Sequence, residues 1–162
     1  MISTRTVRIL AALPALAAIS PAVIAHADNA RLNYDVYGNI YTAQRQNGCP
    51  VDARMDSRLT EAARRHTFDV RDHPSIDGDI GSDGSTPQDR ATAAGYRGKV
   101  SETVAINPAL AISGVEIVNQ WWDDPVSRAI MQDCNNTAIG VWSENSLART
   151  VVVAVYGQPV TG

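Results

Sequence analysis

The sequence predicts an α/β protein: a three-layer α/β/α sandwich around a short, mostly antiparallel sheet. Two observations carry this prediction. Apolar residues recur at helical spacing through residues 31–70, and two β-branched segments joined by a polar turn occupy residues 137–156. The expected order is helix, helix, helix, strand, helix, strand, strand, which suits helices on both faces of one sheet better than a Rossmann unit. The glycine-rich phosphate-binding motifs are absent from the sequence, so nucleotide binding has no support.

The first helix is expected over Arg31–Gln46, where one face is apolar and the other polar. Gly48 and Pro50 end it. A second helix follows Asp56, a suitable N-cap, and carries an apolar stripe that includes His66. We therefore expect His66 on the buried side, as a hydrogen-bonded core histidine. The apolar positions are Leu32, Val36, Ile40 and Ala43 in the first helix, and Leu59, Ala62, Ala63 and Val70 in the second.

A short third helix and a strand come next. Thr86 is expected to cap the helix, with Pro87 in its first turn. Gly95 provides the left-handed residue that commonly ends a helix. Val100–Ile106 has alternating character and includes β-branched residues, so it predicts a strand. This strand carries Glu102.

The remaining elements are a fourth helix and two strands. Ser113 opens a capping-box pattern at the start of the helix, and Pro125 is expected to end it. Strands are expected over residues 137–143 and 150–156. The continuous run Val151–Val153 is typical of a central strand that is covered on both faces.

The first 27 residues are typical of a secretory signal peptide. Two arginines precede an apolar run, and Ala25-His26-Ala27 matches the A-x-A cleavage pattern. A membrane anchor is the weaker alternative, because two prolines interrupt a run that is shorter than the roughly 20 residues a spanning helix needs. We therefore expect cleavage after Ala27, a single domain over residues 28–162, and a secreted protein located outside the cell or in the cell envelope.

The charge of the chain disfavours nucleic acid as a partner. The full sequence has 14 basic and 17 acidic residues, for a net charge of -3. Loss of the signal segment, which holds two arginines and no acid, would take this value to -5. No later segment is long and apolar enough to predict a transmembrane helix.

Two cysteines, Cys49 and Cys134, are present. In an exported chain an even pair most simply forms one disulfide. The alternative is two free thiols or metal ligands, but neither cysteine has a second cysteine or histidine at the short spacing typical of zinc sites.

Several motifs have a familiar arrangement. Gln46-Asn47-Gly48-Cys49 closes the first helix, Gly81–Tyr96 combines a polar loop with a capped helix, and Ser101-Glu102-Thr103-Val104-Ala105 lies in the predicted strand. With His73 and a downstream tryptophan, they resemble the CAP superfamily of cysteine-rich secretory, antigen 5 and pathogenesis-related proteins, also called SCP domains. Short secreted bacterial members, particularly mycobacterial ones, are the most similar. The resemblance covers Tyr34–Tyr156 and implies the same three-layer fold.

The resemblance also implies a shallow cleft lined by two histidines and acidic groups, which holds a divalent metal in several members. His73 resembles the first cleft histidine, and Glu102 the glutamate of the family's G-E-N-x-A motif. Asp124 stands near the position of a second acid in some members, and Ser127 replaces the second histidine. Zinc sites favour several imidazoles. We therefore expect no cofactor; His73 is the one candidate ligand for weak divalent metal binding.

Two functions are compatible with these features. The first is a noncatalytic module that binds a lipid, a sterol, a glycan, or a host or envelope protein. The second is a weak peptide or ester hydrolase in which His73 and Glu102 form an acid/base pair. We favour binding, with this pair tying the polar loop to the sheet, because no nucleophile is identifiable beside it. Of the adjacent Trp121 and Trp122, we assign Trp121 to the core and leave Trp122 open as a ligand contact.

Overall fold

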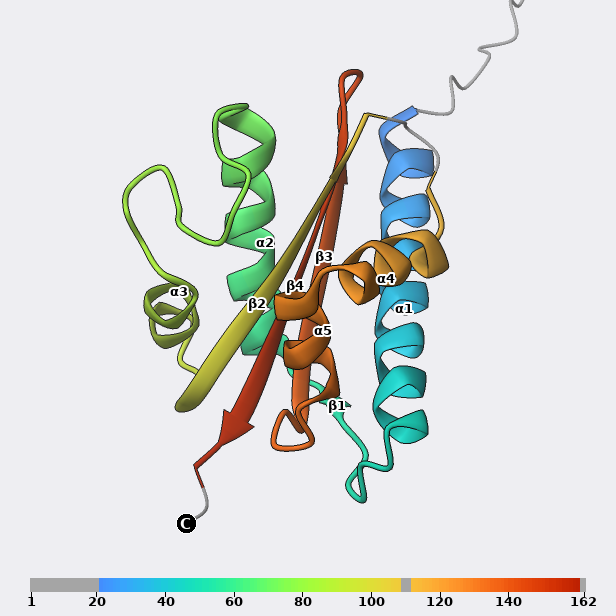
Figure 1. Ribbon diagram of the computed structural model, residues 1–162. Coiled ribbons are helices and arrows are strands. Elements are labelled where there is room, and N and C mark those ends of the chain that lie inside the picture. Colours follow the sequence, from blue (N-terminus) through green and yellow to red (C-terminus); the bar gives the residue numbers. More distant parts are fainter. Residues whose placement is uncertain (1–20, 109–111, 161–162) are drawn as a thin grey trace, which may run out of the picture.

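A mixed four-stranded sheet lies at the centre of the computed structural model, which describes residues 21–108 and 112–160 (Figure 1). Its strands are β1 (Arg54–Met55), β2 (Gly98–Asn107), β3 (Ala138–Asn145) and β4 (Thr150–Pro159). Their order across the sheet is β1-β3-β4-β2. β4 pairs antiparallel with both neighbours, whereas the short β1 is parallel to β3. The predicted, mostly antiparallel sheet is confirmed; β1 is too short for its sequence to have indicated a strand.

The central strand β4 is covered on both faces, as its valine run predicts. Val152 packs in one hydrophobic cluster, and Val151 and Val153 pack in another. All three side chains are fully buried. Because successive side chains of a strand point to opposite faces, the sheet separates two hydrophobic cores.

One helical layer consists of α2 (Ser57–Asp72) and α3 (Pro87–Ala93). The side chain of Asp56 caps α2, and Thr86 opens α3 with a capping box, as predicted. Gly95 follows α3 with a φ of 86°, in the left-handed region that glycine adopts without strain. Local sequence signals therefore fix the ends of both helices.

Helix α2 lies unusually close to the sheet at Gly140 of β3. A Cβ atom at this position would lie 2.1 Å from the main chain of Leu59. The buried face of α2 includes His66, which is 0% exposed. The close approach brings this histidine onto the sheet, and the predicted core position of His66 is confirmed.

The other layer consists of α1 (Pro21–Gln46), α4 (Gly114–Asp123) and α5 (Pro125–Gln132). Figure 1 shows α1 and α4 across the sheet from α2 and α3. The α4 helix starts at the predicted capping box, and the three helices supply Val36, Ile40, Ile117, Trp121 and Met131 to one core cluster. The three-layer sandwich is thus confirmed.

The fourth helix ends before Pro125, as predicted, but the sequence analysis does not predict the helix that follows it. Pro125 is the first residue of α5, and Asp124 is its N-cap, accepting a hydrogen bond from the main-chain N–H of Ser127. Proline is favoured in the first turn of a helix because its missing N–H has no helical partner there. The same residue therefore ends α4 and begins α5.

Most of the expected signal segment, residues 1–20, lies outside the described residues. Helix α1 begins at Pro21, ahead of the expected cleavage site after Ala27. Cleavage there would shorten α1 and leave in place the residues that pack on the sheet, such as Val36 and Ile40. Among the residues described, no helix has the length and apolar character needed to cross a membrane.

The predicted disulfide between Cys49 and Cys134 is confirmed. It joins the chain just after α1 to the chain just after α5, across a sequence separation of 85 residues. In the chain-entropy view, closing a loop of this length stabilises the folded state by about 4 kcal/mol. The disulfide therefore links the C-terminal end of α1 to the segment between α5 and β3.

Candidate functional site

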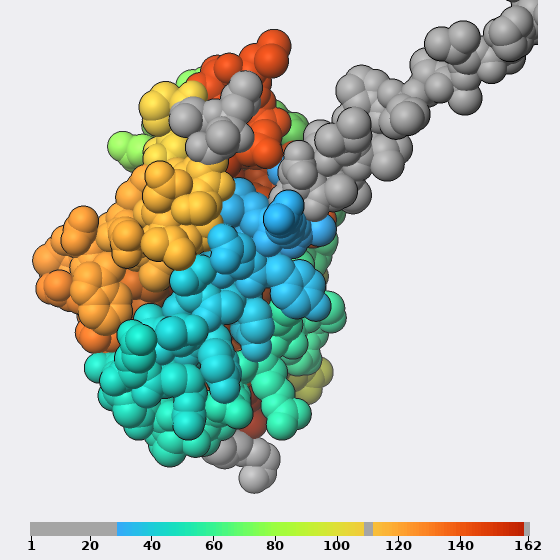
Figure 2. All heavy atoms as spheres, turned by 90° about the vertical axis from the view of Figure 1, so that its right-hand side faces the viewer, coloured from blue at the N-terminus to red at the C-terminus, as the bar shows by residue number. Residues whose placement is uncertain are grey.

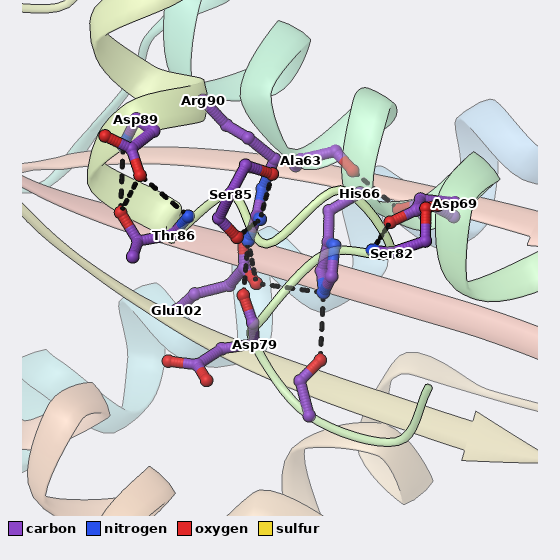
Figure 3. A network of polar contacts seen from close by, with 12 residues as sticks. Ala63, His66, Asp69, Asp79, Ser82, Ser85, Thr86, Asp89, Arg90 and Glu102 are labelled. Carbon is purple, nitrogen blue, oxygen red and sulfur yellow. Dashed lines mark hydrogen bonds and ion pairs between the residues drawn. The ribbon is translucent and has the colours of Figure 1, made fainter. Parts of the chain in front are cut away.

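Glu102 lies at the centre of a buried polar network between the sheet and the α2/α3 layer (Figure 3). Its side chain is 0% exposed. The Oε1 atom accepts a hydrogen bond from Nη2 of Arg90 at 3.0 Å and lies 3.5 Å from Nε2 of His66. Neighbouring β2 residues on the same face, such as Val104, pack with α2 and α3. The alternation of the strand thus directs Glu102 toward these helices.

Arg90 connects this network to the loop that precedes α3. Its Nη1 atom donates to the carbonyl oxygen of Ser85 at 2.7 Å, and Nη2 donates to that of Asp79, also at 2.7 Å. The residue is 6% exposed. One planar guanidinium therefore holds two points of the loop and the carboxyl group of Glu102 at once.

His66 provides a further attachment for the same loop. Its Nε2 atom lies 2.9 Å from the carbonyl oxygen of Gly78. A carbonyl only accepts, so this bond requires the tautomer that carries hydrogen on Nε2. Burial lowers the pKa of His66, while the bond to Gly78 opposes this shift in part. At neutral pH the ring is therefore uncharged and acts as a structural donor.

The carboxyl group of Glu102 has an unusual acidity. Burial raises its pKa to about 8, and the charge and hydrogen bond of Arg90 offset only part of this shift. Its Oε2 atom has no hydrogen-bond partner among the described residues. Removing a carboxylate from water disfavours its charged form, which explains the direction. Glu102 is thus a buried acid held by Arg90.

The predicted pairing of His73 with Glu102 was wrong. His73 is the C-cap residue of α2, its side chain is 53% exposed, and its Nδ1 atom lies 2.8 Å from Oδ1 of Asp69. The buried stripe of α2 ends at Val70, so His73 lies beyond the part of the helix that packs on the sheet. His66, on the buried stripe, takes the position next to Glu102.

Asp69 also binds the loop. It accepts hydrogen bonds from the main-chain N–H of Ser82 at 2.7 Å and from the hydroxyl of Ser82 at 2.6 Å. Burial acts to raise the pKa of Asp69, but these hydrogen bonds and His73 outweigh it and lower the pKa. The hydroxyl donates to the carboxylate and not to the imidazole, which is not the order in which a histidine activates a serine nucleophile.

Asp124 and Ser127 do not join this network. They belong to the start of α5, and the helices of that layer pack in the core cluster on the opposite face of the sheet from Glu102. The side chain of Asp124 accepts from the main-chain N–H of Ser127 at 2.8 Å, and hydrogen bonds with the side chain and the main chain of Ser127 lower the pKa of Asp124. Both residues therefore serve the helix cap here.

A hollow of about 400 Å³ lies at the surface beside the network, against α2, α3 and the loop. Glu102 does not line it, whereas Arg90 does. In the chain segments that the structure describes, no three histidine, cysteine or acidic side chains gather closely enough to hold a metal ion. The residues lining the hollow are Arg65, Asp69, Ser82, Asp83, Ser85, Asp89, Arg90 and Ala93.

Two residues of the network were not assigned to the site from the sequence. His66 is expected as a hydrogen-bonded core histidine whose partner is not named, and Arg90 falls within the Gly81–Tyr96 motif without a role of its own. For each of them, one feature of the sequence indicates a role in the site. A histidine on an apolar helix stripe needs a buried polar partner, and a glutamate in an apolar strand needs a cation or a donor.

Comparisons with known proteins agree with the fold. Structures that match include an outer surface protein of Borrelia burgdorferi, with a TM-score of 0.66 and 16% identity over 77% of this chain and 90% of that one. An extracellular protein with an SCP domain from Bacillus anthracis has a TM-score of 0.74 and 13% identity over 86% of this chain and 44% of that one. A cysteine-rich secretory protein from Staphylococcus aureus has a TM-score of 0.61 and 10% identity, over 80% and 39%.

These identities establish a common fold only, and two of the three neighbours are more than twice as long as the part that this chain covers. No curated protein matches the sequence. The family model for CAP, the cysteine-rich secretory protein family, matches residues 29–156. This span includes the disulfide, the sheet and the polar network. The chain belongs to the CAP family.

Proposed function

We propose that this CAP protein is a secreted, noncatalytic binding module. One observation carries the proposal: the acid that resembles the family's cleft glutamate, Glu102, is fully buried and held by Arg90 beneath a loop. A general acid or base must come within hydrogen-bond reach of the substrate proton. In this arrangement Glu102 binds Arg90, which holds the loop in place, and the outer surface of the molecule remains for recognition.

The loop over residues 78–85 supports this reading. It is attached through the carbonyl oxygens of Gly78, Asp79 and Ser85, which accept from His66 and Arg90. Its own side chains are largely exposed. Surface loops positioned by a rigid scaffold commonly carry binding functions. The candidate ligands are a lipid, a sterol, a glycan, or a host or envelope protein.

Secretion is supported by three features. The N-terminal 27 residues have the pattern of a signal peptide. The Cys49–Cys134 disulfide suits an oxidising compartment. The Bacillus anthracis neighbour of similar fold is described as extracellular. The proposed location is the medium or the cell envelope.

The proposal is tested by measuring turnover and capture with the same preparations. Wild type, Glu102→Gln and His73→Ala are incubated with peptide and ester libraries, and also with lipid vesicles, oligosaccharides and purified extracellular-matrix proteins. We expect no turnover that depends on either residue and at least one captured ligand, with capture unchanged in His73→Ala. Turnover that disappears in Glu102→Gln, or the absence of capture from every class, would contradict the proposal.

A hydrolase remains the alternative, and one observation favours it in a changed form. His73 is exposed, and its Nδ1 atom lies 2.8 Å from Oδ1 of Asp69, so the two side chains form an imidazole–carboxylate pair at the surface, as in many hydrolase sites. A hydrolase of this kind would use Asp69 in place of Glu102. Turnover that Asp69→Asn and His73→Ala abolish, and that Glu102→Gln leaves intact, would identify it.

A further inference from the structure

We infer that the groove between α1 and α4 binds a neutral carbohydrate, with Trp122 stacking on a sugar ring. This inference rests on the proposed binding function and names its ligand class and site. The groove has a volume of about 310 Å³, at the lower end of the range of about 300–1,000 Å³ that small-molecule sites occupy. Its lining residues are Asn39, Thr42, Ala43, Gln46, Val118, Asn119 and Trp122.

The groove lies on the outer face of the α1/α4 layer, across the sheet from the Glu102 network. In Figure 2, the yellow-orange to orange α4 lies beside the blue to cyan α1 on the face toward the viewer. Ala43 and Val118 are buried and supply its apolar lining, while Trp122 is 36% exposed. An indole in this position offers a large, rigid apolar face to a ligand.

The polar lining has unused hydrogen-bonding capacity. The amides of Gln46 and Asn119 and the indole N–H of Trp122 form no hydrogen bond to any described residue. Asn39 donates its amide hydrogens to Asp35, which leaves its carbonyl oxygen as an acceptor. Side-chain amides carry both donors and acceptors. Paired hydroxyl groups of a sugar, which also donate and accept, match this set.

The lack of charged side chains in the groove restricts the class of ligand that it can bind. None of the groove's lining residues is acidic or basic. A phosphate, sulfate or carboxylate ligand would find no opposite charge among these residues. An alkyl chain would cover the amides of Asn39, Gln46 and Asn119 without satisfying them. A neutral sugar satisfies the amides and presents its C–H face to the indole.

The experiment uses the full mature protein and an array of neutral oligosaccharides: cello-, chito-, manno- and β-1,3-gluco-oligosaccharides. We expect at least one of them to bind. Trp122→Ala should then weaken binding about fivefold, because one aromatic contact contributes on the order of 1 kcal/mol. Trp122→Phe should retain most of the affinity. Asn119→Ala should weaken binding several-fold through its lost amide.

Two control variants lie on the same helix outside the groove. Val115→Ala removes an exposed apolar side chain, and Gln120→Ala removes an amide that is bonded to Asn107. Neither should change the affinity. Circular dichroism and thermal unfolding of every variant verify that the fold is intact.

The possible results separate this inference from the proposed function. Binding of an oligosaccharide with equal affinity by wild type and Trp122→Ala would overturn the assignment of the groove. Binding of vesicles or a matrix protein, with no oligosaccharide bound, would overturn the carbohydrate inference and leave the binding function standing. A wild type that captures no ligand of any class would overturn both.

Discussion

Replacing Arg90 by Met tests the view that one guanidinium holds the loop to the sheet. The variant loses the hydrogen bonds to the carbonyl oxygens of Ser85 and Asp79 and to the carboxyl group of Glu102, of 2.7, 2.7 and 3.0 Å. Methionine retains much of the apolar stem, so the main losses are polar. Hydrogen bonds to charged groups contribute about 1.5–3 kcal/mol each, and they are not additive.

The expected loss in the free energy of unfolding is therefore about 3–5 kcal/mol, the range typical when one partner of a buried ion pair is removed. Protonation of Glu102 moderates the loss, because burial already raises its pKa to about 8. Arg90→Lys should lie between wild type and Arg90→Met, since a single ammonium group cannot reproduce the fork of the guanidinium.

Urea unfolding followed by circular dichroism, with the disulfide intact, measures these differences by linear extrapolation. Arg65→Met is the matched control. Arg65 belongs to the same layer, pairs with Glu61 at 2.9 Å and is 45% exposed, so its loss should cost less than about 1 kcal/mol. Hydrogen exchange of the amides of residues 78–85 should increase in Arg90→Met and not in the control. An Arg90→Met protein within 1 kcal/mol of wild type, with unchanged exchange, would refute the reasoning.

Three further predictions concern acidity, covalent linkage and packing. Because burial raises the pKa of Glu102, the unfolded chain releases this proton near pH 4.5 and the folded chain near pH 8, so the free energy of unfolding should fall as pH rises between these values. The Glu102→Gln variant should lose this pH dependence. The pKa of His66 is lowered from 6.5, so in both proteins His66 makes the free energy of unfolding rise with pH below pH 6.5. Replacing Cys49 and Cys134 together by Ser should cost about 2–5 kcal/mol in urea unfolding, and a midpoint equal to that of wild type would contradict the role given to the disulfide. Gly140→Ala should lower the free energy of unfolding by more than about 2 kcal/mol, because the added methyl group would lie 2.1 Å from the main chain of α2. The control Gly38→Ala, whose Cβ meets nothing within 4 Å, should not lower it.

The helices and their caps could be predicted because their signals are local. Asp56, Thr86 and Ser113 each accept a hydrogen bond from the main chain of the next turn, as their sequence context indicates. Helix α5 was not predicted, because Pro125, which correctly marks the end of the fourth helix, also suits the first turn of a new one. The two-residue β1 exists through its parallel pairing with β3, a contact that no local pattern encodes.

The candidate site was predicted less well, because it depends on contacts between distant elements. The resemblance identified Glu102 as a site residue, and the lack of a nucleophile led to the expectation that it ties the loop to the sheet. The resemblance also indicated His73 as its partner, which the structure does not show. The choice between His73 and His66 depends on where α2 leaves the sheet, which is a tertiary property. His66 was correctly placed on the buried stripe. Its polar partner was the missing step.

The attachment of the loop has a consequence for how its chemistry can change. His66 and Arg90 donate hydrogen bonds to the main-chain carbonyl oxygens of residues 78, 79 and 85. Every amino acid has such an oxygen. Gly78 has open space where a Cβ would lie. Substitutions at these positions can therefore alter the outward-facing chemistry while the anchorage persists. The domain therefore suits a display library in which the side chains of the loop are varied and its attachment to His66 and Arg90 is kept.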